Sequence, residues 1–300
     1  PGILGASAPK INNADMKSYG WEMELSWRDR IEDFNYGVRF TLADGQRKVL
    51  KYPNESGDIY SWYNNKLDGT IWGYTTVGIA QTQEEMDAHL ANNKPNWGSK
   101  WGAGDIMYAD LNGDGEVTSG SKTLNDHGDL KVIGNSYARY NFGFTVDGSW
   151  KGLDFSIFLQ GTMKRDYWLD GPYFWGASGD EWQSACFTEH LDYWTPEHTN
   201  AYYPKPYFGN IKKNQEVQSG YLQNAAYLRV KNVQVGYTLP KSWTKKAAME
   251  SVRFYVSGDN LLTWTGISSV FDPETLGGDW GPGKLYPLQR TLSVGVNVNF

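Results

Sequence analysis

The stretch YGWEMELSWRDR, residues 19–30, decides the fold class, because large apolar side chains occupy every second position. One parity carries Tyr19, Trp21, Met23, Leu25 and Trp27, and the other carries Glu22, Glu24, Ser26 and Arg28. Successive side chains of a β-strand point to opposite faces, so the pattern predicts a strand with one apolar and one polar face. The segment FNYGVRFTL, residues 34–42, repeats the pattern after a short polar turn, which predicts a β-hairpin.

The same alternation recurs to the end of the chain and predicts about seven long strands in all. The further alternating segments are 142–150, 153–159, 228–239, 252–256 and 292–300. Within 228–239 the apolar parity changes near Lys231 and Asn232, which predicts a β-bulge at that point.

The predicted connections fall into two length classes that alternate along the chain. Three are short, near 31–33, 149–151 and 240–249, and three are long, about 45–136, 163–221 and 263–287. Outer-membrane β-barrels have short periplasmic turns and long extracellular loops. A soluble β-sandwich has no reason to sort its connections in this way, so the order favours a barrel wall.

Composition excludes several classes of protein. The 300 residues carry a formal net charge of -6 and no basic cluster longer than Lys245 and Lys246, so we expect no nucleic-acid partner. Cys186 is the only cysteine, which excludes an internal disulfide. Aromatic residues reach 15%, and the mean hydropathy is -0.59. Low hydropathy is compatible with a membrane barrel, because apolar and polar positions alternate along each strand.

Six stretches resemble one family, the SusC/RagA-type TonB-dependent outer-membrane transporters, and occur in that family's order. They are IWGYTTVGIAQTQEEMD (71–87), GDIMYADLNGDGEV (104–117), HGDLKVIGNSYARYNFGF (127–144), YWTPEHTNAYYP (193–204), AAYLRVKNVQVGYTLPK (225–241) and FYVSGDNLLTWT (254–265). The resemblance extends over nearly the whole chain and is to the C-terminal third of such proteins.

The resemblance implies an all-β fold: an antiparallel transmembrane β-barrel wall made of about seven C-terminal strands of a 22-stranded barrel, with long extracellular loops and one short loop helix. It implies a bacterial outer-membrane importer of oligosaccharides or peptides that contacts the lipid. Its partners would be a SusD-like surface lipoprotein and the TonB complex. We expect residues 1–300 to lack the plug domain and TonB box, which lie N-terminal in the family.

The segment QTQEEMDAHLAN, residues 81–92, is the one predicted helix. Glu84 and Glu85 occupy the first turn, and Met86 and Leu90 share a face at a spacing of four residues. We expect a short helix inside the first long loop.

The stretch DLNGDGEV, residues 110–117, resembles the start of a calcium loop. Carboxylate and amide oxygens at positions 1, 3 and 5 and a glycine at position 6 are the pattern of such loops, but the bidentate glutamate of position 12 is replaced by Ser121. A structural Ca²⁺ would need further ligands; an aspartate-rich turn without a metal accounts for the same residues. The candidate ligands are Asp110, Asn112, Asp114, Glu116, Asp126 and Asp129.

The loop 163–221 is unusually aromatic, with 14 Phe, Trp or Tyr among its 59 residues. Surface loops are normally poor in large apolar side chains, so these residues pack against something. They either stack on a sugar substrate, or pack the loop on itself or on the partner lipoprotein. The second interpretation is favoured because a long ordered loop must offset its conformational entropy. The candidate substrate-binding residues are Trp168, Tyr173, Trp175, Trp182 and Trp194.

A soluble binding module and an enzyme are the two alternatives to the importer. A soluble calcium-dependent carbohydrate-binding β-sandwich would explain the aromatic residues and the aspartate loop, but it requires Trp21, Phe142, Val235 and Phe254 to lie inside a closed core. An enzyme is not expected, because no Ser-His-Asp order, phosphate loop or HExxH motif is found. Paired acids such as Glu22 and Glu24 share a face with Arg28 and Arg39, which indicates a charge-balanced wall.

Overall fold

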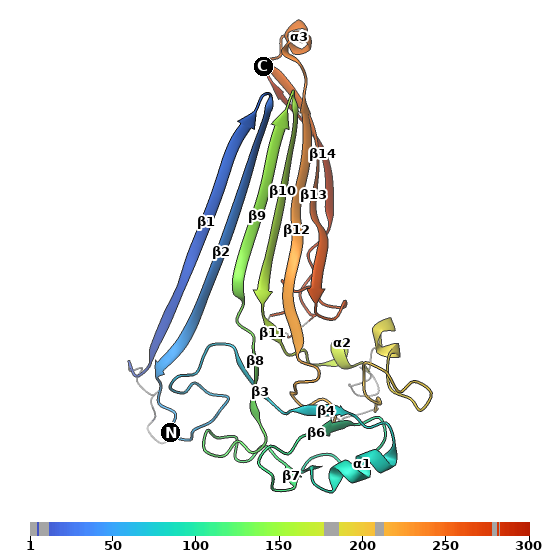
Figure 1. Cartoon of the computed structure of the whole chain (residues 1–300). Coiled ribbons are helices and arrows are strands. Elements are labelled where there is room, and N and C mark those ends of the chain that lie inside the picture. The colour runs from blue at the N-terminus through green and yellow to red at the C-terminus, as the bar shows by residue number, and fades with distance from the viewer. Residues whose placement is uncertain (1–4, 6–11, 177–185, 208–212, 278–280, 282) are drawn as a thin grey trace.

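The computed structural model describes residues 5, 12–176, 186–207, 213–277, 281 and 283–300. Seven long antiparallel strands form one sheet in the order β1-β2-β9-β10-β12-β13-β14, and the short β11 pairs with β12 (Figure 1). The long strands are β1 (Asp15–Ile31), β2 (Phe34–Lys51), β9 (Arg139–Trp150), β10 (Leu153–Lys164), β12 (Gln223–Thr238), β13 (Ser251–Gly266) and β14 (Thr291–Asn299). The predicted all-β antiparallel wall is confirmed.

The remaining elements lie mainly in the long connections, gathered at one end of the sheet (Figure 1). They are β3 (Thr70–Gly73), β4 (Thr76–Ile79), α1 (Gln83–Leu90), β5 (Lys94–Pro95), β6 (Ile106–Tyr108), β7 (Glu116–Val117), β8 (Lys131–Asn135), β11 (Asp166–Tyr167), α2 (Pro172–Trp175) and η2 (Thr188–Leu191). Only α3 (Lys241–Thr244) and η3 (Lys245–Ala247) lie at the opposite end, between β12 and β13.

Cross-strand register joins the apolar positions of all seven strands into one continuous face. One row runs Leu25, Phe40, Phe144, Leu159, Val230 and Leu262, and the next runs Trp27, Val38, Val146, Ile157, Val233, Gly258 and Leu292. This face is not the inside of a sandwich. Trp21, Val235 and Phe254 are each 47% exposed, and Phe142 is half-buried.

The opposite face of the sheet is polar and its charges are paired. Arg39 lies 2.9 Å from Glu24, and the guanidinium of Arg253 binds both carboxylate oxygens of Asp154. Asn232 donates to Asp259 over 2.7 Å. The structure therefore has the charge-balanced polar wall that the sequence predicts.

The short connections have the geometry that tight antiparallel turns require. Lys151 and Gly152 link β9 to β10 with φ values of 47° and 91°, and two-residue hairpins prefer positive φ at both positions. A Cβ on Gly152 would lie 2.7 Å from the carbonyl oxygen of Thr238, so the neighbouring strand also leaves no room for a side chain. The end of β14 lies beside the start of β13, on this same side of the sheet.

The predicted bulge and helix are both present. The register of β12 skips Lys231, because Phe158 pairs with Asn232 while Leu159 pairs with Val230. Helix α1 begins after Thr82, whose side chain accepts the backbone N–H of Glu85, and it buries Met86. No helix in the described part of the chain is long and apolar enough to cross a membrane.

Candidate functional site

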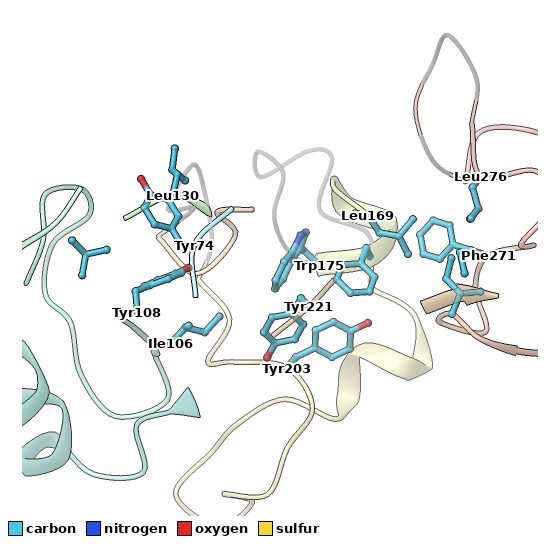
Figure 2. Packing of buried hydrophobic residues seen from close by; sticks show 14 of the residues in the cluster. Tyr74, Ile106, Tyr108, Leu130, Leu169, Trp175, Tyr203, Tyr221, Phe271 and Leu276 are labelled. Atoms are coloured by element: carbon cyan, nitrogen blue, oxygen red, sulfur yellow. The ribbon is translucent and has the colours of Figure 1, made fainter. Parts of the chain in front are cut away.

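The three long connections, 52–138, 165–222 and 267–290, share a single hydrophobic core at one end of the sheet. The first contributes residues such as Tyr74 and Tyr108, the second Trp175 and Tyr203, and the third Phe271 (Figure 2). Tyr108 and Phe174 are fully buried. Burial of large aromatic side chains is the main stabilising term available to these segments, so they fold as one unit, here named the loop assembly.

A buried ion pair holds the first and second connections together. Lys213 Nζ lies 2.7 Å from Asp105 Oδ2, and both side chains are at most 1% exposed. Asp105 also accepts the side-chain amide of Asn214 at 2.9 Å and the backbone N–H of Gly102 at 2.8 Å. A buried charge is tolerated when it is paired and fully hydrogen-bonded, and this carboxylate meets both conditions.

The ring of Tyr207 lies close to two ammonium groups. Lys213 Nζ is 4.3 Å and Lys205 Nζ is 5.7 Å from the ring centroid, and the Tyr207 hydroxyl donates to Asp105 over 3.3 Å. Burial first, and the Asp105 charge second, raise the pKa of Tyr207 well above its ordinary value. The phenol therefore stays protonated and neutral at physiological pH.

The third connection is fixed to the polar face of β12 by a second ionic cluster. Arg229 is 2.9 Å from Asp272 and 2.7 Å from Glu274, and Lys231 is 2.8 Å from Glu274. The side chain of Arg229 is only 3% exposed. Arg229 and Lys231 are two residues apart on β12, and both reach the carboxylate of Glu274. This cluster brings the start of the third connection against the polar face of the wall.

A hollow of about 480 Å³ lies where the first and second connections meet. Its walls come from the α1–Ala103 segment on one side and from Tyr193–Tyr207 on the other. Its volume is within the range of ligand sites in proteins. A smaller hollow of about 250 Å³ adjoins it and shares Tyr193, Lys205, Pro206 and Tyr207.

The predicted aromatic residues do not form one surface. Trp175 and Trp194 are 8% and 5% exposed, Trp168 is half-buried against the shared core, and Tyr173 is stacked on Phe187 at 5.8 Å. Trp182 lies outside the described residues. Of the four described residues, Trp194 alone borders the larger hollow. The structure packs Trp175 into the core that the three connections share.

The predicted metal-ligand residues form two turns with engaged carboxylates. Asp110 accepts the backbone N–H groups of Asn112, Gly113 and Gly115, and these bonds lower its pKa. Asp129 accepts the backbone N–H groups of Leu111 and Thr118. Asp126 accepts the backbone N–H of Ser121. Asp114 accepts the side-chain amide of Asn112 and the backbone N–H of Glu116. Among the described residues no group of three His, Cys, Asp or Glu is placed to hold a metal ion.

Sequence reasoning missed the two ionic clusters. Asp105 and Lys213 are 108 positions apart, and Arg229 and Asp272 are 43 apart, so nothing local relates them. The parity change near Lys231 and Asn232 predicts the bulge, but not the carboxylates that Arg229 and Lys231 meet.

Comparison with known proteins gives consistent matches, although no family model matches the chain. TonB-dependent receptor P3 of Formosa agariphila is 26% identical over 330 residues, which cover 100% of this chain and 30% of that protein. TonB-dependent receptor SusC of Bacteroides thetaiotaomicron is 23% identical over 304 residues, which cover 96% of this chain and 27% of SusC. The chain thus spans about 30% of the length of these relatives.

Solved structures with the same fold are those of the RagAB peptide transporter. One matches 100% of this chain and 31% of its own chain with a TM-score of 0.70 at 21% identity. A second, of the RagAB peptide importer in the "open-open" state, gives a TM-score of 0.68 at 20% identity. The wall of seven strands and its loop assembly are therefore a known arrangement.

Proposed function

Since this chain corresponds over its whole length to about 30% of a TonB-dependent receptor of the SusC/RagA family, we propose that it is part of the wall and outer mouth of a bacterial outer-membrane importer. TonB-dependent receptors reside in the outer membrane and are not enzymes. The proposed cargo is an oligosaccharide or a peptide. RagAB is a peptide transporter, and its structure shares the wall strands described above with this chain.

The observation that carries the proposal is the exposed apolar face. Ten residue steps separate Trp21 from Ile31 in β1, which is about 34 Å of strand at ~3.4 Å per residue. A strand tilt of about 40° reduces this height to about 26 Å, close to the ~25 Å apolar band of outer-membrane barrels. Asp29 is the charged exception, and it lies two residues from the end of the strand. Hydrocarbon is the solvent that this face fits.

The polar face would then line the inside of the barrel, and the loop assembly would surround the outer mouth. Interior-facing polar residues and long outer loops are how such barrels divide their two faces and ends. Among the described residues β1 pairs only with β2, and β14 only with β13. Unpaired strand edges are not stable in lipid, so further strands must complete the ring.

The energy source and the partner belong to the same proposal. Import would draw on the TonB complex, acting through the part of the receptor outside this chain. A SusD-like surface lipoprotein would cover the outer mouth, where the three long connections gather around one shared core (Figure 1).

The uptake experiment uses the complete receptor in its own bacterium. Deleting the receptor gene, or removing the TonB complex, should abolish growth on one class of oligomer, glycan or peptide, and leave growth on its monomers unchanged. Deleting the neighbouring SusD-like protein should reduce uptake of the same oligomer. Equal growth of all strains on every oligomer would contradict the proposal.

A soluble carbohydrate-binding sandwich does not fit the described residues. Its defining feature would be two sheets packed face to face over a core, whereas the buried cluster here lies in the loops and the apolar face of the long sheet is open. The sheet needs lipid or detergent, not a second sheet, to cover it.

A structural Ca²⁺ held by Asp110, Asn112, Asp114, Glu116, Asp126 and Asp129 stays a prediction. The backbone N–H bonds to Asp110 already account for the turn, and the residues described give no closed cage of oxygen ligands. Adding calcium to the chelator-treated receptor should raise the melting temperature of the loop assembly if the ion binds there. Asp114→Asn should then abolish that rise, and an unchanged melting temperature would leave the turn alone as the explanation.

A further inference from the structure

The larger hollow between the first and second connections has an unusual charge balance. Among the described residues its lining includes Lys100 and Lys205 but no aspartate or glutamate, although the chain as a whole has a net charge of -6. The polar lining also includes Gln83, Tyr193, Thr195 and Tyr207. A concave surface with one sign of charge concentrates ligands of the opposite sign.

The two lysines of this hollow are not neutralised by their neighbours. Both are exposed, and among the described residues neither has a carboxylate oxygen within 4.0 Å. The carboxylate that lies behind the hollow, Asp105, is already paired with the buried Lys213. Three lysines against one aspartate leave a formal surplus of two positive charges.

Carboxylates near the rim are partly engaged elsewhere. Asp87 accepts the side-chain amide of Gln83 at 2.8 Å, and Asp192 is 2.8 Å from His198. Glu197, beside the lining residue Pro196, is exposed to solvent. Among the residues that the structure describes, neither Lys100 nor Lys205 has a hydrogen-bonded partner of opposite charge, so both ammonium groups remain open to a ligand.

The hollow is also held in shape by groups that a ligand would not have to move. Gly102 donates its backbone N–H to Asp105 at 2.8 Å, and Lys205 donates its backbone N–H to Gly104 at 2.8 Å. Trp194 is buried and donates its indole N–H to Gln81 over 3.3 Å. Lys100 has a φ of 54°, a conformation that the surrounding structure must hold in place. A preformed site loses less free energy on binding than a flexible one.

We infer that this hollow binds a carboxylate group carried by the oligomer to be imported, with Lys100 and Lys205 as its cationic partners and Tyr193 as a flat contact surface. The inference rests on the proposed transport function and adds a substrate class to it: acidic oligomers. The carboxylate can belong to a uronic-acid oligosaccharide or to an acidic peptide, and the chemistry at the two lysines is the same for both.

The test is calorimetric titration of the complete receptor in detergent with four probes: hexagalacturonate, triglutamate, and the neutral maltohexaose and triserine. Acidic probes should bind more tightly than neutral ones, and affinity should fall as salt is raised, because exposed charges are screened. Preference for the acidic sugar alone or the acidic peptide alone identifies the source. Equal binding of acidic and neutral probes overturns the inference.

Lysine variants test the location. The double variant Lys100→Gln/Lys205→Gln should bind the preferred acidic probe about ten-fold more weakly, since each exposed ion pair contributes up to about three-fold. Lys131→Gln removes an exposed lysine of β8 outside the hollow and should change affinity by less than about two-fold. The arginine pair Lys100→Arg/Lys205→Arg should restore binding. If Lys131→Gln weakened binding as much as Lys100→Gln/Lys205→Gln, the binding site would not be this hollow.

The uptake assay separates this inference from the proposed function. If the receptor imports a neutral oligomer in a TonB-dependent way and acidic probes gain nothing from the lysines, only the present inference fails. If no oligomer is imported through TonB, the transport function fails, while the lysine dependence of binding is still decided by titration of the purified receptor.

Discussion

The wall and the loop assembly treat apolar side chains in opposite ways. In the wall, Trp27 and Leu292 are 62% and 74% exposed, and no second layer covers them in the described part of the chain. In the loop assembly, Tyr108 and Phe174 are fully buried in a core that three connections share (Figure 2). The comparison teaches that one chain is built for two solvents: hydrocarbon around the wall and water around the loops.

The largest expected effect is in the loop core. Phe174→Ala should destabilise the loop assembly by about 3–5 kcal/mol, because a buried aromatic ring is replaced by a cavity. Hydrogen exchange of backbone amides in the complete receptor measures the change. Tyr286→Ala, at a site that is 87% exposed, should cost less than about 0.5 kcal/mol. Equal protection in the two variants would mean that the connections have no common core.

The wall should respond to charge according to the face it enters. Ile157→Arg places a cation on the apolar face, near the middle of the band, and should lower the free energy of unfolding in lipid vesicles by about 2–4 kcal/mol. Its neighbour Ser156 is on the polar face opposite Asp147, so Ser156→Arg should cost less than about 1 kcal/mol. Urea-driven unfolding in vesicles measures both. If Ser156→Arg destabilised the wall more than Ile157→Arg, the assignment of the lipid and interior faces would be wrong.

The junction between the two regions should show an intermediate effect. Glu274→Gln removes a carboxylate from the buried Arg229 and from Lys231. The loss should reduce the stability of the 267–276 segment by about 1.5–3 kcal/mol, the value of a hydrogen bond to a charged group. Hydrogen exchange of the backbone amides in this segment measures the loss of stability. Lys284→Gln, an exposed change in the same connection, is the control, and matching losses would show that the ionic cluster does not hold the segment.

The smallest effect is a pH dependence within the loop assembly. Burial raises the pKa of Glu216 above its ordinary 4.5, and Lys122 opposes this in part. The folded state therefore favours the protonated acid, and stability falls as pH rises through the raised pKa. Glu216→Gln should stabilise the assembly at pH 8 by less than about 1 kcal/mol, after screening, and have no effect at about pH 4. Thermal melts of this variant at the two pH values test the prediction. Glu55→Gln, a change at an exposed glutamate, is the control.

Much of the fold was predictable because the deciding interactions are local. Alternation predicted the seven strands, the parity change predicted the bulge at Lys231, and Met86 with Leu90 indicated helix α1. The strands run further than alternation indicates: β2 continues to Lys51 and β13 to Gly266. Backbone pairing with the neighbouring strand extends them through residues that do not alternate.

The candidate site was less predictable. The aromatic richness of residues 163–221 was visible, but not which rings would be buried, and Trp175 and Trp194 prove to be core residues. Nothing in the sequence distinguishes Lys100 and Lys205, because a single lysine in a loop resembles any solvated charge. Their significance comes from the absence of carboxylates in a hollow formed by segments about 100 residues apart.

The sequence by itself determined the two-faced strands, the order of short and long connections, and the family resemblance. A period of two residues is set by backbone geometry and needs no partner to be read. Only the tertiary structure decided that three long connections share one core, that Asp105 meets Lys213, and that Arg229 meets Asp272 and Glu274. The physical reason is that such contacts join residues distant in the chain, and their free energy depends on burial that no local pattern specifies.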